Sequence, residues 1–494
     1  MCDVGYKKVL ATIILIFTFL LVISGAALAA GGETEAIGYR LPLWSVLPFV
    51  GMLLSIAIFP LVNPHWWEHN QGKVSVFWII VFLIPFFFAY GGGETLAQLL
   101  HSVVLDYIPF IVLLFGLFTV AGGIILRGTL RGTPLTNLIM LTIGTIISSW
   151  VGTTGAAMLL IRPVLRANQW RKHRKHIVVF FIFLVCNIGG SLTPIGDPPL
   201  FLGFLRGVPF FWTMNLIFPM AFNAVILLAI YYFMDRYYYK KELVANPENL
   251  VLDENEKKEA LRIDGIHNLI FLVMIVGSVI LSGTLSKNLA FIDQATGALK
   301  GLHLYTHQGH PIVMPYTNII QITIILLAAF LSLKTTPKAI REDNKFTWAP
   351  IKEVAKLFIG IFITMIPALA ILNARGAELG LTEPAHFFWA TGALSSFLDN
   401  APTYLVFMTT AASLGAAEGV VTTVGTIAPE MLLAVSCGAV FMGANTYIGN
   451  APNFMVRSIA EENGIQMPSF FGYMGWALVF LIPLFILDTL IFFI

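Results

Sequence analysis

The sequence predicts an all-α polytopic membrane protein that contains an inverted repeat, two re-entrant helical hairpins and two broken transmembrane helices. The 494 residues are 57% hydrophobic and only 11% charged, whereas a soluble protein is typically about 25% charged. Apolar runs recur at lengths near the ~20 residues that cross a bilayer. Two of these runs are interrupted by stretches rich in glycine and proline, and each interruption has a counterpart in the other half of the chain.

Residues 1–30 have the pattern of a signal peptide. Lys7 and Lys8 precede an apolar run, which is followed by a small-residue cleavage site ending at Ala29. An uncleaved first helix is the alternative. The sequence then predicts a first transmembrane half, a cytoplasmic linker and a second transmembrane half. These parts cover residues 31–234, 235–265 and 266–494.

In the first half, an apolar segment at 135–165 is flanked by basic residues on both sides. Arg127 and Arg131 precede it, and a basic cluster at 166–175 follows it. Because basic flanks favour the cytoplasm, both ends of the segment are expected inside. A re-entrant hairpin with its tip at 148–155 satisfies this condition, and two short full spans are the alternative. Ordinary spans are expected at about 41–62, 74–90, 103–126 and 210–234.

The second half repeats the plan with the opposite orientation. A hairpin at 384–414 is expected to enter from outside with its tip at Asp399 and Asn400, and a broken helix is expected at 427–454. Loop charges alone give this orientation, so the two halves form an inverted repeat. Ordinary spans are expected at about 266–285, 317–333, 351–372 and 471–494.

The break in the first half lies within residues 177–205, where positions 187–201 read NIGGSLTPIGDPPLF. Pro198 and Pro199 cannot donate backbone hydrogen bonds, so a regular helix cannot continue through this point. Broken backbone inside a bilayer is tolerated only where protein buries it or where it lines a water-filled cavity. A charge at that depth costs roughly 2.5–3.5 kcal/mol. Asp197 is therefore a candidate functional residue, and a surface loop is the alternative.

The same pattern returns at 443–454 as GANTYIGNAPNF, at an offset of 253 residues. The hairpin tips also correspond, since SSWVGTT at 148–154 aligns with SSFLDNA at 395–401 at an offset of 247. Two breaks at nearly one offset indicate an internal repeat. Paired, interrupted hydrophobic segments point to the binding site of a transporter. Each half supplies one carboxylate, Asp197 from a broken helix and Asp399 from a hairpin tip.

The sequence does not favour an enzyme or a nucleic-acid-binding protein. It contains no nucleotide-binding glycine motif, nucleophile elbow or zinc motif. The net charge of +2 comes with no basic groove, and the three cysteines lack metal-ligand spacing. His303, His307 and His310 fall in a loop that is expected to be solvated. No transition-metal site is expected.

The paired motifs resemble those of the ion transporter superfamily. Within it, the chain is similar to the branch that holds NhaD-type sodium/proton antiporters, arsenite carriers and citrate transporters, and the similarity begins near Leu41. The resemblance implies a homodimer in the lipid bilayer of the bacterial inner membrane. It also implies a scaffold domain and a moving transport domain, whose two hairpin tips and two broken helices form the site.

The resemblance implies that hydroxyl, amide and carboxylate side chains on the four breaks bind a small cation and a proton. These residues are Thr153, Thr154, Asn187, Thr193, Asp197, Asp399, Asn400, Thr403, Asn445, Thr446 and Asn450. The helix-breaking or hinge positions are Gly189, Gly190, Gly196, Pro198, Pro199, Gly449 and Pro452. The dicarboxylate branch carries Ser-Asn-Thr at both tips, whereas this chain has Gly-Thr-Thr and Asp-Asn-Ala. Its tips therefore do not match the known carboxylate binders.

The charges of the predicted pocket favour a cation as substrate. A pocket of carboxylates, amides and hydroxyls suits hard cations such as sodium. Asp197 and Asp399 cannot both ionise cheaply in one low-dielectric site, so one is expected to hold a proton until sodium binds. This competition predicts Na+(Li+)/H+ antiport by alternating access, with Na+ as the transported or coupling ion and no other cofactor.

Two other functions remain as alternatives. A carrier of citrate, another organic anion or an oxyanion, coupled to sodium or protons, would need compensating positive groups. Only Arg162 and the N-termini of half-helices are available for that purpose. A channel or a non-transporting receptor is the third hypothesis, and the paired breaks weigh against it.

Overall fold

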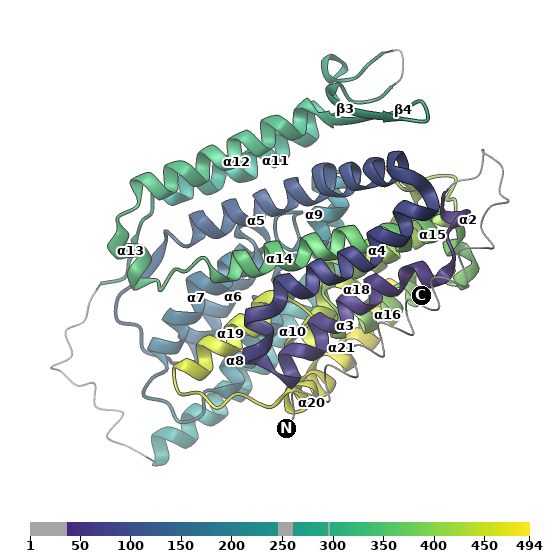
Figure 1. Ribbon diagram of the computed structural model, residues 1–494. Helices are drawn as coiled ribbons and strands as arrows, with labels where there is room; N and C mark the ends of the chain where they lie inside the picture. The colour runs from purple at the N-terminus through teal and green to yellow at the C-terminus, as the bar shows by residue number, and fades with distance from the viewer. Residues whose placement is uncertain (1–36, 246–259, 295–296) are drawn as a thin grey trace, which may run out of the picture.

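The computed structural model describes residues 37–245, 260–294 and 297–494. The predicted signal peptide or first helix at 1–30 and residues 246–259 of the predicted linker lie outside these ranges. The described chain is mainly helical, and its only strands form three short two-stranded pairs within these ranges. Figure 1 shows the long helices running in a common direction, with β3 (Gly301–His307) and β4 (His310–Pro315) beyond one end of α11 (Asn268–Leu285) and α12 (Tyr316–Thr335).

Seven helical runs in the described ranges are long and apolar enough to cross a membrane. An eighth is added if the pair at Ala349–Thr364 and Ile366–Leu379, which bends by 43°, counts as one span. The chain is thus an all-α polytopic protein, as predicted. The seven runs are Leu43–Val62, Pro64–Ala121, Pro134–Val151, Phe210–Val244, Asn268–Leu285, Tyr316–Thr335 and Phe470–Phe492.

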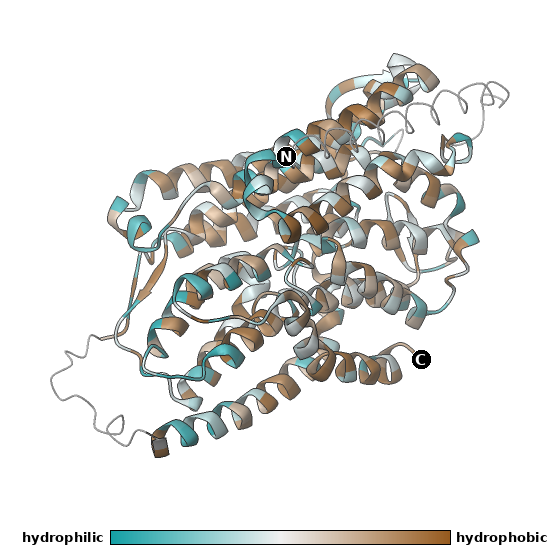
Figure 2. Cartoon of the chain, turned by 60° about the horizontal axis from the view of Figure 1, so that its bottom comes forward, coloured by the Kyte–Doolittle hydropathy of each residue, from teal (hydrophilic) through white to brown (hydrophobic). Residues whose placement is uncertain are grey.

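The outer surface of these helices is apolar, as Figure 2 shows by colour. Phe88 and Phe218 are 81% and 74% exposed, and many other large apolar side chains lie open on the same helices. Soluble proteins rarely expose contiguous apolar patches of this kind. The exposed surface therefore fits contact with lipid tails.

The predicted spans at 74–90 and 103–126 fall in one helical run that is kinked between them. One helical run extends from α4 (Pro64–Leu100) through a π-helix (His101–Tyr107) into α5 (Ile108–Ala121). The run bends at Gly91, whose φ of 82° and ψ of 165° are not helical. Gly91 is the first of three glycines at 91–93 and directly follows the predicted span at 74–90, so the kink lies between the two predicted spans. α3 (Leu47–Val62) precedes this run, after α2 (Ile37–Arg40) and a 3-10 turn (Leu43–Val46).

The predicted hairpin in the first half consists of α6 (Pro134–Val151) and α7 (Thr153–Ala167). The turn between them is Gly152 alone, with a φ of 81° that favours glycine. At the open end, the side chains of Asn137 and Asn168 donate to each other at 2.9 and 2.7 Å. The two helices therefore run antiparallel. Whether the hairpin is re-entrant in a bilayer stays a prediction.

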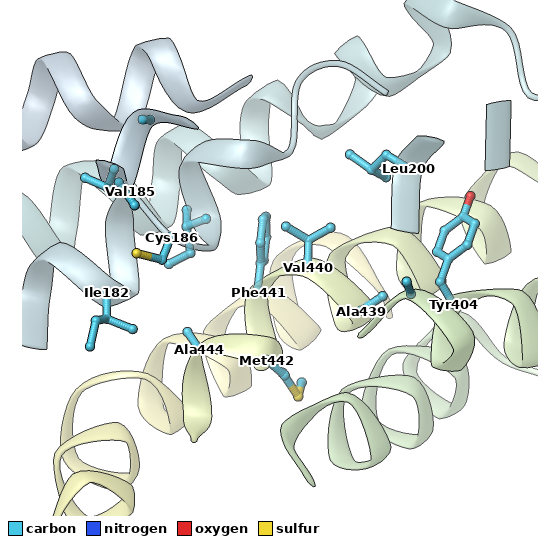
Figure 3. Packing of buried hydrophobic residues seen from close by; sticks show 14 of the residues in the cluster. Ile182, Val185, Cys186, Leu200, Tyr404, Ala439, Val440, Phe441, Met442 and Ala444 are labelled. Atoms are coloured by element: carbon cyan, nitrogen blue, oxygen red, sulfur yellow. The ribbon is translucent and has the colours of Figure 1, made fainter. Parts of the chain in front are cut away.

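The first broken helix appears where the motif predicted it. α8 (Lys175–Leu184) ends before a 3-10 turn (Ile188–Gly190), and α9 (Pro198–Leu205) begins after seven residues without regular structure. Every residue of α8 from His176 to Leu184 is buried. A helix that is apolar on all sides belongs in a core. In Figure 3, Ile182, Val185 and Cys186 lie close to Phe441 and Ala444 of the second half.

The helix α10 (Ile217–Ala245) extends beyond the predicted boundary at 234. Asp235 and Glu242 form ion pairs with the buried Arg171 at 2.5 and 2.9 Å. These charges made the segment look like a polar linker, yet they are paired inside the protein and the helix continues. A 3-10 helix (Phe210–Leu216) precedes α10. β1 (Ile125–Arg127) pairs with β2 (Arg262–Asp264), which lies in the last part of the predicted linker.

The second half contains a similar series of helices. α11 and α12 are joined through β3 and β4, which the sequence did not predict. α13 (Lys338–Asp343) leads to the bent pair α14 (Ala349–Thr364) and α15 (Ile366–Arg375), and a 3-10 turn (Gly376–Leu379) follows. The predicted second hairpin is formed by α16 (Pro384–Phe397) and α17 (Asn400–Ser413), which pack against each other.

The second broken helix consists of α18 (Pro429–Met442), a 3-10 turn (Gly443–Asn445) and α19 (Ala451–Glu462). A short strand pair, β5 (Val420–Thr422) and β6 (Gly425–Ile427), connects α17 to α18, and α20 (Phe470–Phe480) with α21 (Ile482–Phe492) ends the chain. Both hairpins and both broken helices are present at the predicted positions. The inverted orientation of the two halves stays a prediction.

Candidate functional site

Asp197 lies at the point where all four breaks meet. It is 1% exposed and precedes the first residue of α9. Its Oδ1 accepts hydrogen bonds at 3.0 Å from Thr153 Oγ1 and at 3.0 Å from Asn450 Nδ2, and its Oδ2 accepts one at 2.7 Å from Asn400 Nδ2. These donors belong to the first hairpin tip, the second broken helix and the second hairpin tip. The first broken helix, which carries Asp197, is therefore in direct contact with the other three breaks.

Equivalent hydrogen bonds join each hairpin to the broken helix of its own half. Thr193 Oγ1 donates to the carbonyl of Ser149, and Thr446 Oγ1 donates to the carbonyl of Ser396. The Ser149 and Ser396 hydroxyls donate in turn to the carbonyls of Gly189 and Met442, which also correspond at the offset of 253. Thr193 and Thr446 thus fix the backbone of the breaks and do not point their hydroxyls to Asp197.

Each break also contains a close contact between two main-chain segments. A Cβ atom on Gly196 would lie 2.1 Å from the carbonyl oxygen of Gly190, and one on Gly449 would lie 2.5 Å from that of Gly443. Real Cβ atoms are not found at such distances, so no other residue fits at Gly196 or Gly449 without movement of the backbone. We refer to these two contacts as the glycine crossings.

The prolines predicted to break the helices start the helices that follow. Pro198 and Pro199 form the first turn of α9, and Pro452 lies in the first turn of α19. Proline is favoured at this position because its missing N–H would have no helical partner there. In each break, a glycine allows two main-chain segments to pack closely, and proline marks where the next helix begins.

Asn187 lies behind Asp197 in a layer of amides. Its Nδ2 donates at 2.8 Å to the carbonyl of Ile182 and at 2.8 Å to Asn453 Oδ1, and its Oδ1 accepts a longer bond of 3.3 Å from Asn450. Asn453 donates to the carbonyls of Gly443 and Thr446, both at 2.9 Å. Asn187 therefore positions Asn450, and its side chain forms its hydrogen bonds with groups other than Asp197.

Asp399 lies at the second tip and faces a cavity. Its side chain accepts a hydrogen bond of 3.0 Å from the N–H of Ala401 and so caps α17. Thr403 Oγ1 donates to the backbone carbonyl of Asp399 at 2.9 Å. Asp399 is half-buried, whereas Asp197 is fully enclosed. The two carboxylates therefore occupy different environments, Asp197 among amide and hydroxyl donors and Asp399 at the cavity wall.

Two amide oxygens at the site have no hydrogen-bond donor. Asn400 Oδ1 and Asn445 Oδ1 are buried and accept no hydrogen bond from any residue that the structure describes. Their nitrogen atoms are engaged, because Asn400 Nδ2 binds Asp197 and Asn445 Nδ2 donates at 2.9 Å to Ser396 Oγ. Buried polar groups are normally satisfied. Free amide oxygens are suitable ligands for a hard cation, and Asn400 lies beside the carboxylate of Asp197.

A cavity of about 360 Å³ reaches the site from one side. It is lined by residues of α3, α4, α5 and α14, and by residues of both hairpin tips and both broken helices. The predicted site residues Thr153, Thr154, Asp399 and Asn450 are all part of the lining. The ionisable acids of the lining are Glu68, Glu353 and Asp399, and within the described ranges the lining contains no lysine, arginine or histidine.

Several residues of the site were missed in the sequence. Ser149 and Ser396 were part of the aligned tip motifs, and Asn453 was part of the NAPN motif, but their roles as hydrogen-bond partners depend on the folded backbone. Glu353, which accepts a hydrogen bond of 2.6 Å from Gln71, also lines the cavity. It belongs to α14, which no motif connected to the tips. Arg162, the predicted basic partner for an anion, is not part of the cavity lining.

The comparisons with known proteins agree with this architecture. The model of a protein family described as "Putative citrate transport" matches residues 38–493, which is nearly the whole chain. No curated protein matches the chain. The family match covers both hairpins, both broken helices and every residue of the site.

Proposed function

Because this chain belongs to the family described as "Putative citrate transport", we propose that it is a secondary active transporter and not an enzyme. We propose further that it exchanges Na+ or Li+ for protons. The observation that carries this second step is the pair of free amide oxygens, Asn400 Oδ1 and Asn445 Oδ1, on the elements that surround Asp197. The proposal includes a homodimer in the bacterial inner membrane, as the sequence resemblance implies.

The chemistry of the site supports a cation over a carboxylate-bearing substrate. Asp197 is enclosed by three donors, so in its ionised form its charge is held by hydrogen bonds at both oxygens. The cavity that leads to it carries three acidic side chains and no basic one among its described lining residues. An anion with two or three charges would meet repulsion along this path, whereas a small cation would be attracted.

The proposed exchange is a competition for Asp197 and Asp399. A proton neutralises a carboxylate when sodium is absent, because two ionised carboxylates near one low-dielectric site repel each other. When Na+ enters the cavity, it takes carboxylate and amide oxygens as ligands and the proton leaves toward the water-filled side. Either occupant reduces the charge at the site, which lowers the cost of moving the site through the membrane.

Transport of citrate or another organic anion is the second candidate, and the family description favours it. The observation in its support is that four half-helices, α7, α9, α17 and α19, all begin at the site. Helix N-termini carry partial positive charge and bind anionic groups in other transporters. In this alternative, Asp197 and the free amide oxygens would bind the coupling sodium ions.

Reconstitution of the protein in liposomes with an internal pH-sensitive dye tests the proposal. Addition of NaCl or LiCl should move protons without citrate, and addition of KCl should not. Asp197→Asn and Asp399→Asn should abolish this signal while the protein still inserts. Asp488→Asn is the matched control, because Asp488 is also buried and accepts hydrogen bonds from an asparagine, Asn223, but lies on α21 outside the site. A response that requires citrate would favour the second candidate.

A further inference from the structure

Three metal-binding side chains lie together at the start of α4, in the sequence His-Trp-Trp-Glu-His at 65–69. The ligand atoms of His65, Glu68 and His69 all lie within 4.8 Å of one another, and all three side chains are exposed. Residues three and four positions apart share one face of a helix. The spacing therefore directs two imidazoles and one carboxylate to the same point in space.

The orientation of His69 suits a metal ligand. Its Nδ1 lies 2.9 Å from the backbone carbonyl oxygen of His65. A carbonyl only accepts hydrogen bonds, so Nδ1 carries the proton in the neutral ring and Nε2 keeps its lone pair. A metal-binding histidine typically donates its other ring N–H in this way. The rings of His65 and His69 are 4.7 Å apart between centroids and nearly perpendicular, so they do not stack against each other.

The distances between the ligand atoms are compatible with zinc after small rotations. Zinc binds imidazole nitrogen at about 2.0–2.1 Å, which places the ligand atoms of a tetrahedral site about 3.4 Å apart. Exposed side chains reach this separation by changes in side-chain torsion alone. Three protein ligands leave the fourth position for water. Two imidazoles with one carboxylate favour Zn2+ over Mg2+ or Ca2+, which prefer oxygen ligands only.

The position of Glu68 connects this cluster to the cavity. Glu68 is exposed and also lines the cavity, together with Pro64 and Trp67 from the same helical turn. Glu68 therefore lies at the mouth of the cavity. We propose that His65, Glu68 and His69 form a Zn2+ site, and that an ion bound there restricts entry of the transported cation. The inhibition, though not the binding, rests on the proposed transport function.

Metal binding is tested first, without reference to transport. Purified full-length protein with its affinity tag removed is titrated with Zn2+ by calorimetry, and with Co2+ for the visible absorption of a tetrahedral complex. One saturable site is expected, and His65→Ala and His69→Ala should each weaken it at least tenfold. His386→Ala is the matched control, because His386 is an exposed histidine in the first turn of α16, which also begins with proline. It should leave the affinity unchanged.

Equal Zn2+ affinity in the double variant His65→Ala/His69→Ala, or no saturable binding by the folded wild type, would overturn the site. If an alanine variant proves unstable, His69→Gln keeps the polar contact and should weaken binding in the same way. In the liposome assay, Zn2+ on both sides should slow proton movement in the wild type and not in the double variant. Full activity with Zn2+ bound would overturn the proposed restriction of entry while leaving the transport proposal intact.

Discussion

The side-chain nitrogen of Asn400 donates a hydrogen bond of 2.7 Å to Asp197 across a separation of 203 residues. It joins the hairpin tip of one half to the broken helix of the other. Neither half contains the complete site, because the donors to Asp197 come from both. The two halves must therefore be folded together before the carboxylate has its partners.

Asn400 is expected to affect ion affinity more than folding. Asn400→Ala removes both the donor to Asp197 and a free oxygen, while an alanine fits the space. Loss of a hydrogen bond to a charged group costs about 1.5–3 kcal/mol, so we expect the apparent KM for Na+ to rise roughly tenfold or more. Stopped-flow measurement of proton movement in liposomes checks this. Thr410→Val, further along α17, is the control, because the Thr410 hydroxyl donates at 2.9 Å to the carbonyl of Val406, one turn earlier on the same helix. An unchanged KM in Asn400→Ala would contradict the assignment.

The apparent affinity for Na+ should increase with pH. When one proton and one sodium ion compete for one carboxylate, each pH unit below the titration point raises the apparent KM for Na+ about tenfold, because a tenfold higher proton concentration must be displaced. At high pH the KM should become constant. Measurement of initial rates against Na+ concentration at several pH values tests this. A KM that does not vary with pH would exclude direct competition.

The glycine crossings should not tolerate even a methyl group. Gly196→Ala and Gly449→Ala would place Cβ 2.1 and 2.5 Å from a carbonyl oxygen, so the backbone of the break must move. We expect either variant to lose transport and to unfold at a lower temperature. Gly277→Ala is the matched control, since a Cβ there meets no atom within 4 Å. Thermal unfolding in detergent and the liposome assay give the two measurements, and wild-type behaviour of Gly196→Ala would contradict the observed contact.

Arg171 is expected to be essential for stability. It is 2% exposed and is paired with Asp235 and Glu242. Arg171→Met leaves two carboxylates without their cation, and breaking a buried ion pair from one side costs about 3–5 kcal/mol. The midpoint temperature of thermal unfolding should therefore fall markedly. Arg457→Met, which breaks the more exposed pair with Glu461 on α19, should have little effect because such pairs contribute about 0.3–0.5 kcal/mol. Equal effects of both variants would contradict the argument.

The motifs predicted the helix breaks because glycine and proline act locally. A single proline can lie inside a helix, as Pro85 and Pro163 do, but glycine and proline clustered together disrupt helix locally. The positions of both hairpins and both broken helices followed from such clusters and from residues such as Gly152. The meeting of Thr153, Asn400 and Asn450 at Asp197 was also predictable, since the repeat placed them at matching motifs.

Other features depended on tertiary contacts that a single sequence does not contain. The sequence did not predict that helix continues from the kink at Gly91 through to α5. Glu94 lies on this helix and pairs with His307 of β3 at 3.0 Å. Similarly, Asp235 and Glu242 looked like part of a solvated linker until Arg171 was found beside them. Glu353 was missed because the cavity joins α14 to the tips only in the folded protein.

The glycine crossings have a consequence for the choice of ion. A side chain can adjust its torsion angles to ions of different radius, but a contact between two peptide units has no such freedom. The carbonyls and amides of the breaks are thus held at separations set by the close packing of two main-chain segments. We expect the discrimination of Na+ and Li+ against the larger K+ to arise from this rigid main chain, and to persist when individual ligand side chains are replaced.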